Sequence, residues 1–187
     1  IDESEINKVI PTTLGIVADC KKVLEALVTE HQSHATYKEW VDHCLDNKSK
    51  HPFKYKEAND TFCRPQEAIE YIGKITNGEA IITTDVGQHQ MWSAQFYPFK
   101  HHSQWVTSGG LGTMGFGIPS AIGAQLAAPD KTVVCFVGDG GFQMTNQEMA
   151  LLPEYGLNVK IVLINNGTLG MVKQWQDMIY EGRHSHS

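Results

Sequence analysis

A wholly apolar run, Val133-Val134-Cys135-Phe136-Val137, is followed directly by Gly138-Asp139-Gly140-Gly141. The run is rich in β-branched residues, as are strands that are buried on both faces of a parallel sheet. We therefore predict a strand at residues 132–137. The glycines after it allow a tight turn and a close approach of the backbone to a ligand, so the end of this strand is the first candidate site.

Strand and helix patterns alternate on both sides of this run. Further strands are predicted at residues 80–84, 104–107 and 159–164. One helix begins at Pro65 and stops at Asn77-Gly78, and others are predicted at residues 89–96, 117–128, 145–155 and 169–180. Alternation at this spacing indicates an α/β fold, a doubly wound parallel sheet flanked by helices.

Polar segments follow three of the predicted strands. They are Asp85-Val86-Gly87-Gln88-His89, Gly138-Asp139-Gly140-Gly141 and Asn165-Asn166-Gly167. In an open α/β sheet, ligands bind beyond the carboxyl ends of the strands. We therefore expect the three segments to share one site.

Asp139 lies where the N-terminus of a helix would favour an anion such as a phosphate. A carboxylate beside a phosphate needs a cation between them, and Mg²⁺ is commonly held by one carboxylate together with phosphate oxygens. Asn166, at the end of the next strand, and the backbone carbonyl of Thr168 would supply further oxygens. Either motif alone also fits a plain turn, so it is their pairing that predicts a magnesium site.

The composition excludes several classes of function. The formal net charge is −6 and no basic patch is present, which argues against a nucleic-acid or an anionic-membrane surface. No apolar stretch reaches the roughly 18 residues that a membrane span needs. The four cysteines form no CxxC pair, so neither a zinc site nor a disulfide framework is expected. A reducing, cytoplasmic setting fits best.

The chain divides into three predicted segments. Residues 1–35 combine a short strand or loop with a helix at residues 20–30, which Asp19 caps. Residues 36–63 are polar and are interpreted as a linker helix and loop. Residues 64–187 carry the α/β pattern.

The Gly-Asp-Gly motif at residues 138–140, followed by Asn165-Asn166, resembles the signature of thiamine-diphosphate enzymes. Longer stretches are similar to the acetohydroxyacid (acetolactate) synthase branch of that family, and they are residues 86–92, 107–115 and 170–176. The resemblance implies that residues 64–187 are the diphosphate- and magnesium-binding domain, truncated at its C-terminal end. It also implies that residues 1–35 end a central, FAD-type domain.

The resemblance assigns roles to the residues that match the family's motifs. The implied magnesium ligands are Asp139, Asn166 and the carbonyl of Thr168. The implied contacts to the cofactor diphosphate are Gln88, His89, Gly140, Gly141, Gly170 and Met171, with Val86 as a further cofactor contact. The implied supports of the aminopyrimidine ring are Gly112 and Met114, whose side chain would force the cofactor into a V shape. The implied substrate pocket comprises Met171, Val172 and Trp175.

The implied activity is decarboxylation of pyruvate, dependent on thiamine diphosphate and Mg²⁺, with transfer of the two-carbon unit to a second pyruvate or to 2-ketobutyrate. The products, acetolactate and acetohydroxybutyrate, lead to branched-chain amino acids. FAD in the full-length enzyme, a homodimer or homotetramer and a small regulatory subunit belong to the same expectation. The chain offers no candidate for the glutamate that activates the aminopyrimidine in the family, so we expect the isolated chain to be inactive.

Other interpretations stay open at this stage. A pyruvate oxidase, a 2-keto acid decarboxylase or an FAD-independent acetolactate synthase would share the same motifs. A non-catalytic interaction module would keep the fold without turnover, although the retention of Asp139, Asn166 and Met114 argues against it. Residues 110–115 also fit the GxGxxG fingerprint of dinucleotide-binding dehydrogenases. That motif should follow a solid apolar strand, and only residues 104–107 precede it.

Overall fold

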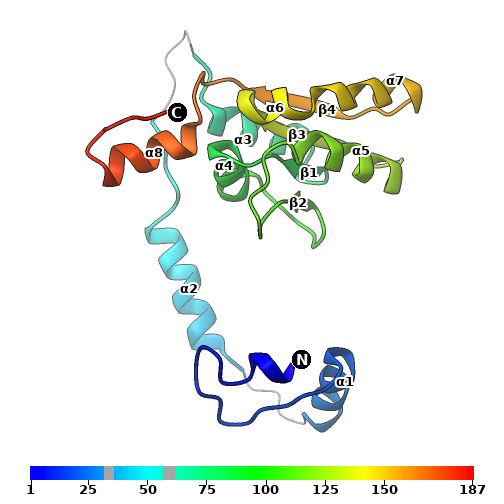
Figure 1. Cartoon of the computed structure of the whole chain (residues 1–187), viewed down its shortest axis with the longest axis vertical. Coiled ribbons are helices and arrows are strands. Elements are labelled where there is room, and N and C mark those ends of the chain that lie inside the picture. Colours follow the sequence, from blue (N-terminus) through cyan, green and yellow to red (C-terminus); the bar gives the residue numbers. More distant parts are fainter. Residues whose placement is uncertain (32–35, 57–61) are drawn as a thin grey trace. The chain divides into compact units, whose positions relative to one another are not determined.

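The computed structural model describes residues 1–31, 36–56 and 62–187 (Figure 1). The chain forms two compact units, Ile1–Pro52 and Phe53–Ser187. The division between them falls inside the predicted linker. The predicted segment boundary at residue 35, and residues 57–61 of that linker, lie outside the described residues. Among the described residues, no helix combines the length and the apolar character that crossing a membrane requires.

The larger unit is built on a parallel four-stranded sheet (Figure 1). Its strands are β1 (Ile81–Thr84), β2 (Trp105–Thr107), β3 (Val133–Gly138) and β4 (Lys160–Ile164), in the spatial order β2-β1-β3-β4. Thr84 pairs with Phe136, and Gly138 pairs with Ile164. Because all four strands run in the same direction, their carboxyl ends lie at one edge of the sheet. The predicted α/β fold class is confirmed.

Helices alternate with the strands of this sheet. They are α3 (Pro65–Ile75), α4 (Gln88–Phe96), α5 (Gly117–Ala127), α6 (Asp139–Thr145), α7 (Leu151–Glu154) and α8 (Gly170–Ile179), with a 3-10 helix, η2 (Asn146–Ala150), before α7. Helices α3 and α4 pack against one face, and α5, α6 and α7 pack against the other. The sheet is therefore doubly wound, as its sequence pattern predicts.

Strand β3 is buried along its whole length, which agrees with its unbroken apolar sequence. Val134 and Phe136 belong to the core on the side of α3 and α4. Val133, Cys135 and Val137 belong to the core on the side of α5, because successive side chains of a strand point to opposite faces. Burial raises the pKa of the Cys135 thiol to about 12, so this thiol stays protonated and packs as a small apolar group.

The region after β3 differs from the prediction of a turn followed by a helix at residues 145–155. Helix α6 starts at Asp139, directly at the end of the strand. The glycines of this segment are therefore helical, and their small size serves the packing described below. The 3-10 helix η2 then separates α6 from α7. This break places Pro153 in the first turn of α7, where a missing N–H costs no helical hydrogen bond.

The smaller unit contains η1 (Glu3–Glu5), α1 (Cys20–Glu30) and α2 (Lys38–Lys50). The Asp19 side chain accepts a hydrogen bond from the backbone N–H of Lys22 at 3.1 Å. The predicted cap of α1 is thereby confirmed.

Candidate functional site

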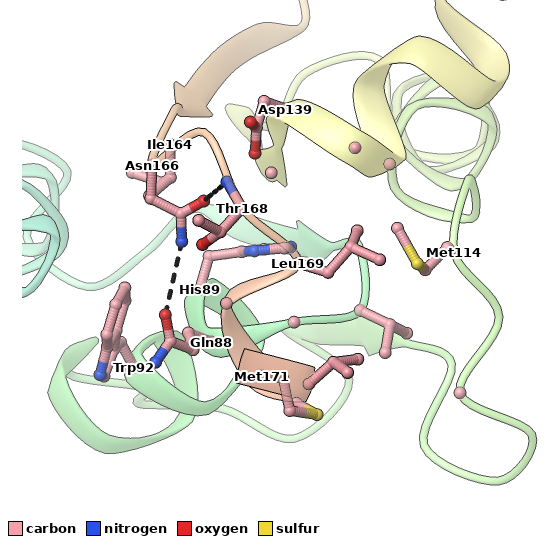
Figure 2. Close-up of a pocket in the computed structure, with 18 residues that line it drawn as sticks. Gln88, His89, Trp92, Met114, Asp139, Ile164, Asn166, Thr168, Leu169 and Met171 are labelled. Atoms are coloured by element: carbon pink, nitrogen blue, oxygen red, sulfur yellow. Dashed lines mark hydrogen bonds between the residues drawn. The ribbon is translucent and has the colours of Figure 1, made fainter. Parts of the chain in front are cut away.

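A pocket of about 240 Å³ lies at the carboxyl edge of the sheet (Figure 2). Its lining comes from four parts of the chain that are distant in sequence. They are residues 86–89 with Trp92, residues 112 and 114, residues 138–141, and residues 164, 166 and 168–172. The expectation that the ends of β1, β3 and β4 share one site is thereby confirmed.

Asp139 and Asn166 both line this pocket, from the ends of β3 and β4. Figure 2 shows them on the same side of the pocket, with Thr168 beside Asn166. Asn166 Oδ1 accepts a hydrogen bond from the backbone N–H of Thr168 at 3.1 Å, which holds the turn after β4. A carboxylate and amide or backbone carbonyl oxygens suit a hard cation such as Mg²⁺. The structure thus brings the three predicted magnesium ligands together, and their metal binding stays a prediction.

No group of three or more His, Cys, Asp or Glu side chains within residues 1–31, 36–56 and 62–187 is arranged to hold a metal ion. The candidate ligands above belong to a different kind of set, with a single carboxylate.

Gln88 connects the segment after β1 to the segment after β4. Its Oε1 accepts a hydrogen bond from Asn166 Nδ2 at 3.4 Å, and its Nε2 donates to Gln174 Oε1 at 3.0 Å. A Cβ atom at Gly170 would overlap both Gln88 Oε1 and Asn166 Nδ2. Glycine at the start of α8 therefore lets that helix lie directly against the pair.

His89 presents an unpartnered polar atom at the pocket. The residue is only 6% exposed, and within the described part of the chain its Nε2 has no hydrogen-bond partner. Burial lowers the pKa of the ring, and the charges of Asp85 and Asp139 oppose this shift. The ring is therefore neutral near pH 7. A buried unpartnered nitrogen that lines a pocket is suited to a hydrogen bond with a bound ligand.

The glycines of α6 form a close-packed cradle. A Cβ atom on Gly140 would lie 3.1 Å from Leu169 Cδ2 and 3.2 Å from Met114 Cε. A Cβ atom on Gly141 would overlap the carboxylate of Asp85. A side chain would therefore have no room at these positions. The prediction had explained the glycines by a tight turn and a close approach to a ligand. The first N–H groups of a helix lack partners inside the helix, so this turn offers donors to a ligand in the pocket.

Asp85 was expected only as the first residue of the polar segment after β1, and no role was predicted for it. The side chain is fully buried. Its carboxylate accepts hydrogen bonds from the backbone N–H groups of Val86 at 2.8 Å, Gly115 at 2.9 Å and Gly117 at 3.0 Å. The available signal was an acidic residue directly after the predicted strand. Trp92 and Leu169 also line the pocket.

The remaining predicted site residues divide into two groups. Most of them line the pocket, namely Val86, Gly112, Met114, Gly170, Met171 and Val172. Trp175 does not line it, and this side chain is 56% exposed on α8. The structure therefore gathers the predicted cofactor contacts but leaves Trp175 outside the pocket wall.

Comparison with known proteins gives a family and a set of relatives. Residues 85–187 match the family described as "Thiamine pyrophosphate enzyme, C-terminal TPP binding domain". Over its whole length the chain is 54% identical to the acetolactate synthase large subunit of Lactococcus lactis subsp. lactis, and the match covers 32% of that protein. It is 44% identical to the acetolactate synthase isozyme 3 large subunit of Escherichia coli, with 33% of that protein covered. It is also 44% identical to the chloroplastic acetolactate synthase 1 of Nicotiana tabacum, with 29% of that protein covered. The chain thus spans about a third of the length of these curated relatives.

Proposed function

The chain belongs to the thiamine pyrophosphate enzyme family, and from this membership we propose that its pocket binds thiamine diphosphate with Mg²⁺ as part of an acetolactate synthase. The observation that carries the proposal is the convergence of Asp139, Asn166 and a glycine cradle in one pocket. The relatives named acetolactate synthase, at 44–54% identity over the whole chain, support this enzyme over other members of the family. Family membership also argues against the dinucleotide interpretation of residues 110–115.

The residues around the pocket fit the diphosphate end of this cofactor. The unpartnered Nε2 of His89 would donate to a phosphate oxygen in the tautomer that carries the proton on this nitrogen. Gln88, Gly140 and Gly141 line the pocket beside it, and Gly170 and Met171 complete the proposed contacts. A Cβ atom on any of these three glycines would press against a neighbouring side chain. These features together support a site for a diphosphate.

Mg²⁺ would be held by Asp139, Asn166 and the backbone carbonyl of Thr168. Mg²⁺ favours six oxygen ligands and is usually bound by one or two carboxylates with phosphate oxygens. In this role the Asp139 carboxylate offsets the charge of the metal, and the metal in turn separates that carboxylate from the diphosphate. Asn166 contributes its amide oxygen, while its Nδ2 remains bonded to Gln88.

The other end of the pocket would orient the aminopyrimidine and thiazolium rings. Gly112 and Met114 line this end, and we propose that Met114 supports the bent conformation of the cofactor. When bound, thiamine diphosphate supplies a nucleophilic carbon and an electron sink for decarboxylation. The protein contributes orientation, which can account for a large part of a rate enhancement.

The proposed reaction converts two molecules of pyruvate into acetolactate and CO₂. With 2-ketobutyrate as the second substrate, it gives acetohydroxybutyrate and CO₂. Met171 and Val172 line the pocket and would contact the keto acids. Trp175 keeps a proposed substrate role only if a ligand or another part of the protein extends the pocket along α8.

The whole protein is proposed to resemble its relatives further. FAD in a central domain, a homodimer or homotetramer, a small regulatory subunit, a cytoplasmic location and a role in branched-chain amino acid synthesis all belong to this proposal. The name "large subunit" of the Lactococcus lactis relative is consistent with a smaller partner subunit.

The test is acetolactate formation by the full-length protein. The assay measures the acetoin obtained from acetolactate, with thiamine diphosphate, Mg²⁺ and FAD omitted in turn. The proposal expects product from pyruvate that requires all three. Product without FAD would favour the FAD-independent synthase. Cofactor binding without any turnover of pyruvate would favour a non-catalytic module, and acetate or acetaldehyde as the main product would favour an oxidase or a decarboxylase.

A further inference from the structure

Gly115 is held through both its backbone N–H and its backbone carbonyl by side chains from two different segments. Its N–H donates to both carboxylate oxygens of Asp85, at 2.9 and 3.1 Å. The carbonyl oxygen of the same residue accepts a hydrogen bond from Thr145 Oγ1 at 3.0 Å. Asp85 follows β1 and Thr145 ends α6, so two elements of the scaffold hold one residue of the loop before α5.

We propose that Asp85 and Thr145 are positioning residues that fix Met114 in the pocket by holding the adjacent residue Gly115. This inference rests on the proposed function, in which Met114 supports the rings of thiamine diphosphate. It adds two residues that do not line the pocket themselves and act through the backbone.

The buried carboxylate of Asp85 is well suited to this role. In addition to the Gly115 bonds, it accepts the N–H of Gly117 at 3.0 Å and that of Val86 at 2.8 Å. A carboxyl group has two acceptor oxygens, and each of them here accepts hydrogen bonds from two backbone N–H groups. One side chain therefore fixes the start of α5 relative to the end of β1.

Thr145 holds the backbone carbonyl of Gly115. Gly115 has a φ of +87°, a conformation that residues with a Cβ atom rarely adopt. A Cβ atom there would lie 3.0 Å from Thr145 Cγ2. The close approach lets the Thr145 hydroxyl reach the carbonyl, so the left-handed conformation and the hydrogen bond depend on each other.

The loop before Met114 is held by one side-chain hydrogen bond, from the backbone N–H of Thr113 to Ser108 Oγ at 3.0 Å. Residues 109–113 are exposed, and the Leu111 side chain is 95% exposed. Met114 is half-buried, with its Cε 3.2 Å from the Cβ position at Gly140. Because the preceding residues are exposed, the position of Met114 relative to α6 depends on what holds Gly115.

The two ends of the pocket would bind different parts of the cofactor. Met114 faces the ring end, whereas His89, Gln88 and the glycines of α6 would bind the diphosphate. Loosening Gly115 should therefore weaken the binding of thiamine diphosphate and leave the binding of inorganic pyrophosphate unchanged. A variant that only damaged the fold would weaken both ligands.

The experiment compares these two ligands by titration calorimetry on the full-length protein with saturating Mg²⁺. The variants are Thr145→Val, which removes the hydroxyl and keeps the shape, its control Thr145→Ser, which keeps the hydroxyl, and Asp85→Asn. We expect Thr145→Val to raise the Kd for thiamine diphosphate about fivefold, as the loss of one hydrogen bond does. Asp85→Asn should raise it by about tenfold or more, since one of the two acceptor oxygens becomes an NH₂ group that faces backbone N–H donors. Thr145→Ser should bind like the wild type.

Unchanged affinity for thiamine diphosphate in Thr145→Val, or an equal loss of affinity for both ligands, would overturn the inference. This variant decides the question even where Asp85→Asn does not fold. Failure of the wild type to bind thiamine diphosphate is a separate result, which would overturn the proposed function first and remove the basis of the inference with it.

Discussion

Asn166 Nδ2 donates a hydrogen bond to Gln88 Oε1 at 3.4 Å, although the two residues lie 78 positions apart. Gln88 in turn donates to Gln174 Oε1 at 3.0 Å. This chain of amides links the ends of β1 and β4 to helix α8. It also holds the Asn166 nitrogen, so the nitrogen points to Gln88 and the oxygen to the Thr168 N–H. An amide oxygen has two lone pairs, and the second one is left for a cation.

Replacement of Gln174 tests the importance of this chain. Gln174→Leu removes the acceptor for Gln88, so Gln88 and then Asn166 are held less firmly. We expect the Mg²⁺ concentration for half-maximal binding of thiamine diphosphate to rise roughly threefold to tenfold. Gln176→Leu is the matched control on the same helix, because the Gln176 side chain bonds to Ser185 and Ser187 near the chain end. Equal effects of the two variants would contradict the role assigned to the amide chain.

Asp139 is the proposed carboxylate ligand of the metal. Asp139→Asn keeps the shape and removes the charge, and it should reduce Mg²⁺ affinity at least about tenfold, or about 1.4 kcal/mol. Asp130→Asn, at an exposed position in the turn before β3, should have no effect. Magnesium titration of both variants, monitored through thiamine diphosphate binding, checks this difference. Wild-type affinity in Asp139→Asn would show that the metal is held elsewhere.

The pKa of His89 predicts how stability depends on pH. Burial lowers this pKa below the ordinary value of 6.5 in the folded protein, whereas the unfolded chain is protonated as the pH falls through that value. The unfolded state then binds more protons, so the contribution of neutral His89 is present above pH 6.5 and is lost progressively below it, down to the lower folded pKa.

His89→Gln removes this titration and should make stability less sensitive to acid. The free energy of unfolding of the wild type should fall relative to that of the variant by up to about 1.4 kcal/mol for each pH unit in this window. Urea unfolding at about pH 7.5 and about pH 5.5 measures the difference. His102→Gln, at an exposed position, serves as the control. Parallel pH profiles for wild type and His89→Gln would refute the assignment.

Two glycines of α5 provide a matched test of packing against Asp85. A Cβ atom on Gly117 would lie 2.9 Å from the Asp85 backbone nitrogen and 3.1 Å from its Cβ, whereas Gly123 has open space. Gly117→Ala should therefore destabilise the protein by about 1–3 kcal/mol. Gly123→Ala should leave stability unchanged or raise it by up to about 1 kcal/mol. The midpoints of urea unfolding decide, and a tolerated Gly117→Ala would show that the end of β1 is not rigid.

Sequence patterns predicted the sheet well because local features encode it. The β-branched, apolar run of β3 is stable only where both of its faces are buried, which requires a layer of helices on each side of the sheet. Polar residues come directly after β1, β3 and β4. Because the predicted sheet is parallel, these residues could be expected at one edge of it without coordinates. The same patterns placed the start of the helix after β3 too late. Two consecutive glycines usually indicate a turn, and the close neighbours that require glycine inside this helix cannot be seen in the sequence.

The role of Asp85 could not be predicted in this way. Its partners Gly115 and Gly117 lie 30 and 32 positions further along the chain, and backbone N–H groups carry no sequence signature. The location of Trp175 outside this pocket could not be predicted for a related reason. Helical spacing places it near Met171 and Val172, but the orientation of α8 relative to the pocket is a tertiary property.

The central claim is that the ends of β3 and β4 hold one magnesium ion that binds the cofactor diphosphate. A crystal structure of the full-length protein with thiamine diphosphate and Mg²⁺ tests it most directly. The account predicts a single metal ion bonded to Asp139 Oδ, Asn166 Oδ1 and the Thr168 carbonyl, with phosphate oxygens completing its shell. A metal ion bound by other residues, or a diphosphate lying away from the first turn of α6, would contradict it.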